Sequence, residues 1–130
     1  MNLRMSETLR RAYVSELEKY REAVRSGRRH DAWTFLERAH VVGQYHPLPH
    51  AEIHARMLLF ALRNGDGREA LGQLPRLTIG WLGSLMNRVP VGNTGGANVP
   101  ILASMPIPED LADVLSEADA GQQRLAGLKR

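Results

Sequence analysis

The sequence predicts an all-α fold: a bundle of about five helices paired as antiparallel hairpins, with a long loop rich in glycine and proline. Apolar residues recur at intervals of three and four along most of the chain, which is the pattern of a helix with one buried face. Capping residues, glycines and prolines separate these stretches. A chain of 130 residues suits one domain, residues 1–130, and we expect its ordered core at about residues 6–125.

Two helices joined by a short turn are expected in the first third of the chain. Ser6 precedes the first helix, and Ser26 and Gly27 end it, because glycine readily adopts the left-handed conformation that closes a helix. Asp31 is the expected N-cap of the second helix, which should run to about Gln44. The apolar stripe of the first helix consists of Leu9, Tyr13, Leu17, Tyr20 and Val24.

Two more helices follow a proline turn at residues 47–49. Proline is tolerated in the first turn of a helix but not in its interior, so the third helix is expected from about Leu48 to Arg63. The fourth should begin near Arg68 and bend at Pro75. Its second half is the least polar part of the protein, with an apolar stripe formed by Leu77, Trp81, Leu82 and Leu85.

Residues 89–108 contain too much proline and glycine for regular structure, and their apolar side chains predict a loop that packs across the helices. A last helix should begin at Pro108, Glu109 and Asp110, where acidic residues favour a helix start, and end at about Leu125. Residues 127–130 are expected to form a frayed tail.

The expected helix pairs resemble tetratricopeptide hairpins, although the interval between Ala32 and Ala70 is longer than in that repeat and its tryptophan and tyrosine pattern is not reproduced. Together with the apolar stripe around Trp81, this likeness supports one hypothesis for the function. In it the chain is a noncatalytic helical-hairpin interaction module that binds a protein partner or forms a homo-oligomer. A buried core face is the other interpretation of that stripe.

Composition excludes several classes of site and partner. The chain has no cysteine, so any metal must be held by nitrogen and oxygen ligands. The net charge is +3, but the arginines are scattered among carboxylates, so a nucleic-acid partner is not expected. The longest apolar run, residues 77–86, is about half of what a membrane span needs. Residues 1–5 lack the apolar region of a secretory signal, and we expect a cytoplasmic protein.

The histidines provide the best chemical lead, because all five fall between His30 and His54. His50 and His54 are four residues apart on the third helix, so they share one face, and His46 precedes them by another four. On the second helix Glu37 and His40 are three apart, an arrangement that directs a carboxylate and an imidazole inward in metal-binding bundles.

If the second and third helices form a hairpin, these groups converge on one point. The predicted metal ligands are Glu37, His40, His50 and His54, with His46 as a substitute from the turn. Such a nitrogen-rich site suits zinc, iron, copper or nickel. The alternative, histidines that are simply satisfied within the core, stays open. The zinc-protease motif is absent, since Ala51 follows His50.

The loop contains a second candidate binding element. Asn93, Thr94 and Gly95 lie in a glycine-rich stretch whose backbone amides could contact a phosphate or carboxylate as part of a cofactor or substrate. A P-loop is not formed, because its lysine and following serine or threonine are missing. A tight turn that closes over the helices is the competing interpretation.

Two segments also carry a family resemblance. Residues 36–44, LERAHVVGQ, with His50 and His54 downstream, and residues 90–96, PVGNTGG, which lead into MPIP at 105–108, are similar to the motifs of a small bacterial family of short helical proteins of unknown function. The resemblance extends from the first helix to about Leu111. It implies that the family's recognisable segments include Glu37, His40, His50, His54 and the Asn93–Gly95 loop, and it implies no activity.

Overall fold

The structure is a computed structural model that describes residues 5–86, 90–101 and 103–128, apart from the side chains of Trp81 and Ala126. Within these residues it contains five α-helices and no strand, which confirms the all-α prediction. The helices are α1 (Glu7–Arg25), α2 (Arg29–Gly43), α3 (Pro47–Arg63), α4 (Gly67–Leu85) and α5 (Glu109–Leu128).

The boundaries of α1 follow the predicted caps, whereas α2 begins earlier than expected. The Ser6 hydroxyl accepts a hydrogen bond from the backbone N–H of Leu9, and Gly27, with φ +71°, lies in the turn that follows α1. The prediction that Asp31 caps α2 is wrong, because Arg28 is the N-cap and its carbonyl accepts the N–H of Ala32. Asp31 lies in the first turn instead, where its carboxylate pairs with the Arg28 guanidinium at 3.2 Å.

Prolines have different effects in α3 and α4. Pro47 occupies the first position of α3, where no helical N–H is required. Pro75 lies inside α4, which continues through it from the Asp66 N-cap to Leu85. Pro75 is exposed, so the carbonyl that loses its helical partner can be hydrated by solvent.

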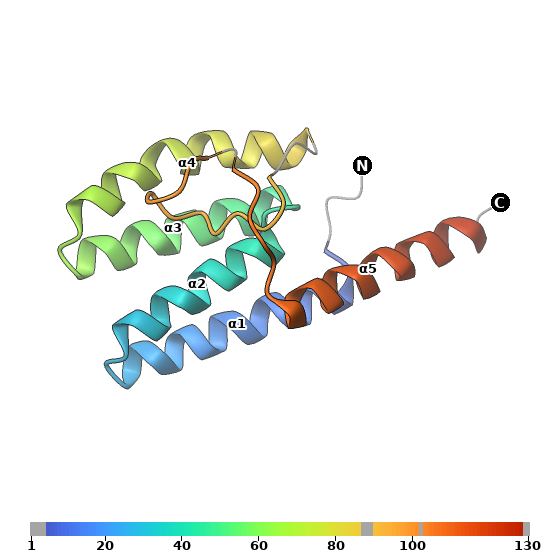
Figure 1. Cartoon of the computed structure of the whole chain (residues 1–130), viewed down its shortest axis with the longest axis horizontal. Coiled ribbons are helices and arrows are strands. Elements are labelled where there is room, and N and C mark those ends of the chain that lie inside the picture. Colours follow the sequence, from blue (N-terminus) through green and yellow to red (C-terminus); the bar gives the residue numbers. More distant parts are fainter. Residues whose placement is uncertain (1–4, 87–89, 102, 129–130) are drawn as a thin grey trace.

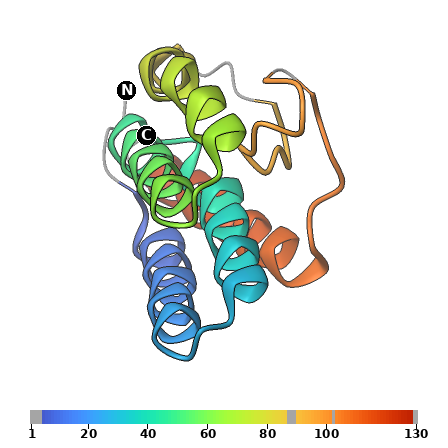
Figure 2. The ribbon, with the colours of Figure 1, turned by 90° about the vertical axis from the view of Figure 1, so that its left-hand side faces the viewer.

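Consecutive helices from α1 to α4 run in opposite directions (Figure 1). α1 packs mainly against α2 and α3 packs mainly against α4, while α2 and α3 join the two pairs. Residues 90–108, where described, cross one face of these helices, and Figures 1 and 2 both place them beside α2 and α4. α5 contacts α1 and α2 through its first half, then projects away and runs to Leu128, past the predicted end near Leu125.

The hydrophobic core lies mainly between α1, α2 and α3, with Leu111 and Ala118 added from α5. The apolar stripe expected on α4 is only partly buried: Leu82 is exposed, and Leu77 and Leu85 are half-buried. The side chain of Trp81 lies outside the described part of the structure. None of the described helices is long and apolar enough to cross a membrane.

A buried ion pair joins three helices. Glu16 of α1 is 3% exposed, and its carboxylate accepts two hydrogen bonds from the Arg38 guanidinium of α2, at 2.9 and 3.0 Å. The same guanidinium also pairs with Asp110 at the start of α5. Both carboxylates raise the pKa of Arg38, which therefore stays charged. Arg38 fixes α5 to the first hairpin by this contact.

We expect Arg38→Ala to destabilise the protein by roughly 3 kcal/mol, because it leaves the buried Glu16 carboxylate without its main partner. Urea unfolding followed by circular dichroism measures the loss. Arg10→Ala is the matched control: its pair with Glu7 is more than half exposed on both sides, and such an exposed pair contributes little to stability. Equal effects of the two substitutions would contradict this account of Arg38.

Candidate metal centre

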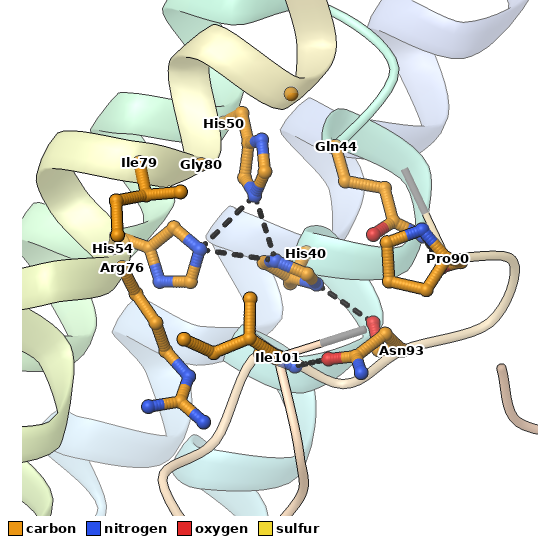
Figure 3. A pocket seen from close by; sticks show the side chains of 12 residues that line it. His40, Gln44, His50, His54, Arg76, Ile79, Gly80, Pro90, Asn93 and Ile101 are labelled. Carbon is orange, nitrogen blue, oxygen red and sulfur yellow. Dashed lines mark hydrogen bonds between the residues drawn. The ribbon is translucent and has the colours of Figure 1, made fainter. Parts of the chain in front are cut away.

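Three buried histidines meet where α2 and α3 lie side by side. His40 comes from α2, and His50 and His54 come from successive turns of α3. Their Nε2 atoms form a nearly equilateral triangle, with distances of 3.1 Å (His40 to His50), 3.2 Å (His40 to His54) and 3.0 Å (His50 to His54). Figure 3 shows the three rings pointing toward one another.

Each ring is held from behind through its other nitrogen. Nδ1 of His40 lies 2.7 Å from the backbone carbonyl oxygen of Asn93 in the loop. Nδ1 of His50 lies 2.6 Å from the Ser84 hydroxyl, and Nδ1 of His54 lies 2.7 Å from Oε1 of Gln73, both on α4. Two segments, α4 and the loop, therefore orient rings that α2 and α3 supply.

The hydrogen-bond partners of the three Nδ1 atoms determine which nitrogen of each ring carries the proton. A backbone carbonyl only accepts, so His40 must carry its proton on Nδ1. The Gln73 amide donates through Nε2 to the Glu69 carboxylate (2.6 Å) and to the Gly95 carbonyl (2.9 Å), which leaves Oε1 as the acceptor for His54. The Ser84 hydroxyl donates to the carbonyl of Gln44, so its oxygen accepts from His50. In their neutral form all three rings consequently present an unprotonated Nε2 to the centre.

Bare backbone of α4 and the loop covers the cluster. A methyl group on Gly80 would come within 2.9 Å of the His50 ring, and one on Gly95, whose φ is +81°, within 2.5 Å of the His40 ring. Only glycine permits this approach, and at Gly95 it also permits the positive φ. At these two glycines the backbone itself therefore covers the histidine rings, with no side chain in between.

Burial keeps the three imidazoles neutral. It lowers the pKa of His50 to about 3 and that of His54 to about 4, and it lowers the pKa of His40 well below its ordinary value. A positive charge on His54 further lowers the pKa of both His40 and His50. The Arg76 guanidinium acts in the same direction on His40 and His54.

Glu37 and His46 are not members of this cluster. Burial raises the pKa of the half-buried Glu37 carboxyl group, and the Glu69 carboxylate acts in the same direction. His46 is buried, with Nδ1 unpartnered among the described residues. It is the N-cap of α3 with extended backbone (φ −128°, ψ 126°), so the helical spacing that joins His50 to His54 does not extend back to it.

The predicted loop residues lie at the site but mostly organise the loop itself. The Asn93 side chain donates to the carbonyls of Pro100 and Ala103 and accepts the N–H of Gly95. Its backbone carbonyl is the acceptor for His40. The Thr94 hydroxyl is buried with no hydrogen-bond partner among the described residues.

The sequence analysis missed the contribution of α4. Gln73, Arg76 and Ser84 are buried on the same helix as Gly80. Their spacing of three, four and four residues places them on one face. A polar and small stripe in an otherwise apolar helix is the signal that could have identified them.

A cavity of about 60 Å³ adjoins the three histidines. Other residues along its wall are Gln44, Arg76, Pro90 and Asn93, together with the exposed Ile79 and Ile101. None of the residues that line it is acidic. The cluster is thus enclosed on its α4 and loop sides and open toward a small chamber.

These features define a small all-helical protein with a buried three-histidine cluster. The chain belongs to the DUF3703 family, described as protein of unknown function, which matches residues 7–115. This confirms the resemblance to a family without a known activity. Comparison with curated proteins and with solved structures gives no match.

We expect the protein to lose stability as the pH falls below about 6.5, the ordinary pKa of histidine. Below that value the unfolded chain binds protons that the folded cluster rejects until about pH 4 to 3. In this range each such histidine lowers the free energy of unfolding by about 1.4 kcal/mol for every unit that the pH falls. Thermal unfolding between pH 7.5 and 5, with a chelator present so that no ion competes with protons, measures the effect. A midpoint that stays constant over this range would contradict the prediction.

Proposed function

We propose that the protein binds one transition-metal ion through Nε2 of His40, His50 and His54. The observation that supports this most directly is that three unprotonated Nε2 atoms face one another at 3.0–3.2 Å. Three lone pairs at this distance repel one another, and burial excludes the water that could separate them. A cation at their common centre turns this repulsion into three favourable bonds.

The dimensions of the cluster suit such an ion. The centre of the triangle lies about 1.8 Å from each nitrogen, close to the roughly 2.0–2.1 Å length of a bond between a metal and an imidazole nitrogen, so the three rings could hold one ion together. Hydrogen bonds from the opposite ring nitrogens are the usual support of histidine ligands, because they fix the tautomer and the ring orientation. All three rings have that support here.

The competing interpretation is that these are core histidines satisfied by the protein. Their Nδ1 atoms are satisfied in that way, but within the described part of the chain their Nε2 atoms meet only one another. Buried polar groups normally have partners, so this arrangement favours an ion. Neutral imidazole ligands suit zinc, copper, iron and nickel, the metals expected from the sequence. Glu37 and His46 are left out of the proposed ligand set because they are not part of the cluster.

Elemental analysis of protein purified without a histidine tag tests the proposal. We expect about one metal ion per chain, and its loss in His50→Ala and in His54→Ala, because two imidazoles hold a metal far more weakly than three. His30→Ala, at an exposed position, and His46→Ala, at a buried position outside the cluster, are the matched controls. Both should retain the metal.

Two results would count against this function. Negligible metal in the wild-type protein, also after incubation with zinc, copper, iron or nickel salts, would remove it. Loss of metal in His46→Ala as complete as in His50→Ala, with the fold intact by circular dichroism, would show that the ligand set is wrong.

Gly80→Ala should weaken metal binding without removing any ligand. The added methyl group would lie 2.9–3.0 Å from the His50 ring and 3.4 Å from that of His54, so the His50 ring must turn away from the centre. We expect at least a tenfold loss in zinc affinity, measured by competition with a chromophoric chelator. Gly121→Ala, where a methyl group meets nothing within 4 Å, is the control and should leave the affinity unchanged. An unchanged affinity in Gly80→Ala would contradict the proposed geometry.

A further inference from the structure

The charge around the cluster is unbalanced once a metal is bound. Arg76 is 8% exposed and lines the cavity, and its guanidinium donates to the carbonyls of Gly72 (2.8 Å) and Val99 (2.7 Å). No carboxylate of the described residues forms an ion pair with it. A metal cation held by three neutral imidazoles would therefore add to a buried positive charge, and this favours a negatively charged ligand from outside.

The cavity also contains an acceptor without a donor. Gln44 is completely buried, and its Nε2 donates to the carbonyl of Pro90 at 3.0 Å. That contact fixes the orientation of the amide, because a carbonyl only accepts. Oε1 is left with no hydrogen-bond partner among the described residues. In Figure 3 this oxygen lies on the side of the amide nearer the histidines. A buried acceptor without a partner destabilises the folded protein, so a hydrogen-bond donor in the cavity would be favourable.

The size of the cavity limits what can supply that donor. Its volume of about 60 Å³ corresponds to about two water molecules at roughly 30 Å³ each. Pockets for larger organic ligands measure about 300–1,000 Å³. The occupant must consequently be a molecule of very few atoms.

We infer that the metal has a fourth, exchangeable position occupied by a small oxygen ligand, water or hydroxide, that donates a hydrogen bond to Oε1 of Gln44 and that small anions displace beside Arg76. This inference rests on the proposed metal site. It adds that three protein ligands leave one position open, as in metal sites that bind an external molecule. Gln44 selects a ligand that carries hydrogen, and Arg76 selects one that carries negative charge.

Cobalt(II) substitution makes the fourth position visible, because the visible absorption of cobalt changes with its ligands. The wild-type protein is loaded with one equivalent of cobalt and titrated with sodium azide, a small anion that cannot donate to Gln44. We expect a saturable change in the cobalt spectrum that fits one azide per metal. Cobalt stoichiometry and thermal unfolding are measured on the same samples.

Two pairs of variants test the roles of the side chains. Gln44→Met removes the acceptor that holds the oxygen ligand, so azide should bind about three- to tenfold more tightly, the effect of one hydrogen bond. Arg76→Gln removes the positive charge and should weaken azide binding about tenfold, whereas Arg76→Lys should restore most of it. Gln122→Met, the same substitution at an exposed position of α5 outside the cavity, is the control for Gln44→Met and should leave the azide affinity unchanged.

The outcomes separate this inference from the proposed function. Full cobalt loading with no spectral response to azide in the wild-type protein would overturn the fourth position and leave metal binding intact. Absence of cobalt binding together with absence of zinc, copper, iron and nickel binding would overturn the proposed function itself. An azide affinity in Gln44→Met equal to or weaker than that of the wild type, with cobalt still bound, would overturn the role of Gln44.

Discussion

Three imidazole rings can face one point only while something holds each of them from the outside, and the rest of this structure depends on that requirement. Neutral rings in a buried space would otherwise rotate to satisfy both nitrogens. Here a loop carbonyl holds His40, and side chains of α4 hold His50 and His54. The rings lie on α2 and α3, whereas every group that orients them lies on α4 or the loop. The packing of α4 on α3 is therefore part of the site as well as of the fold.

Local signals in the sequence predicted most of the helices. The spacing of apolar residues, Ser6 and Pro47 placed the helices of the first half to within a few residues. The prediction that Asp31 caps α2 was wrong because Gly27 reverses the chain so tightly that α2 can start at Arg29 without a side-chain cap. The end of α5 was set too early, since its last turns extend away from the protein and continue by helix propensity alone.

The site was predictable only where its geometry is local. His50 and His54 share a face because they are four residues apart on one helix, and this follows from the sequence. The position of His40 next to them depends on how α2 crosses α3, and the expectation that Glu37 would accompany it did not follow from that crossing. The supporting groups are more distant still: Ser84 lies 34 residues from His50, and Asn93 lies 53 residues from His40. No periodic pattern reports such pairings.

The loop carbonyl that holds His40 determines how much of the chain must be made before the site can form. All three histidines have been synthesised once His54 has been added, but Asn93 is positioned by its side-chain hydrogen bonds to Pro100 and Ala103, which are added later. A nascent chain that stops at the end of α4 contains every imidazole and still leaves His40 free to turn. His40 is therefore held in place only after residues 93–103 have been made, whereas the contacts within the first pair of helices lie entirely within residues 7–43.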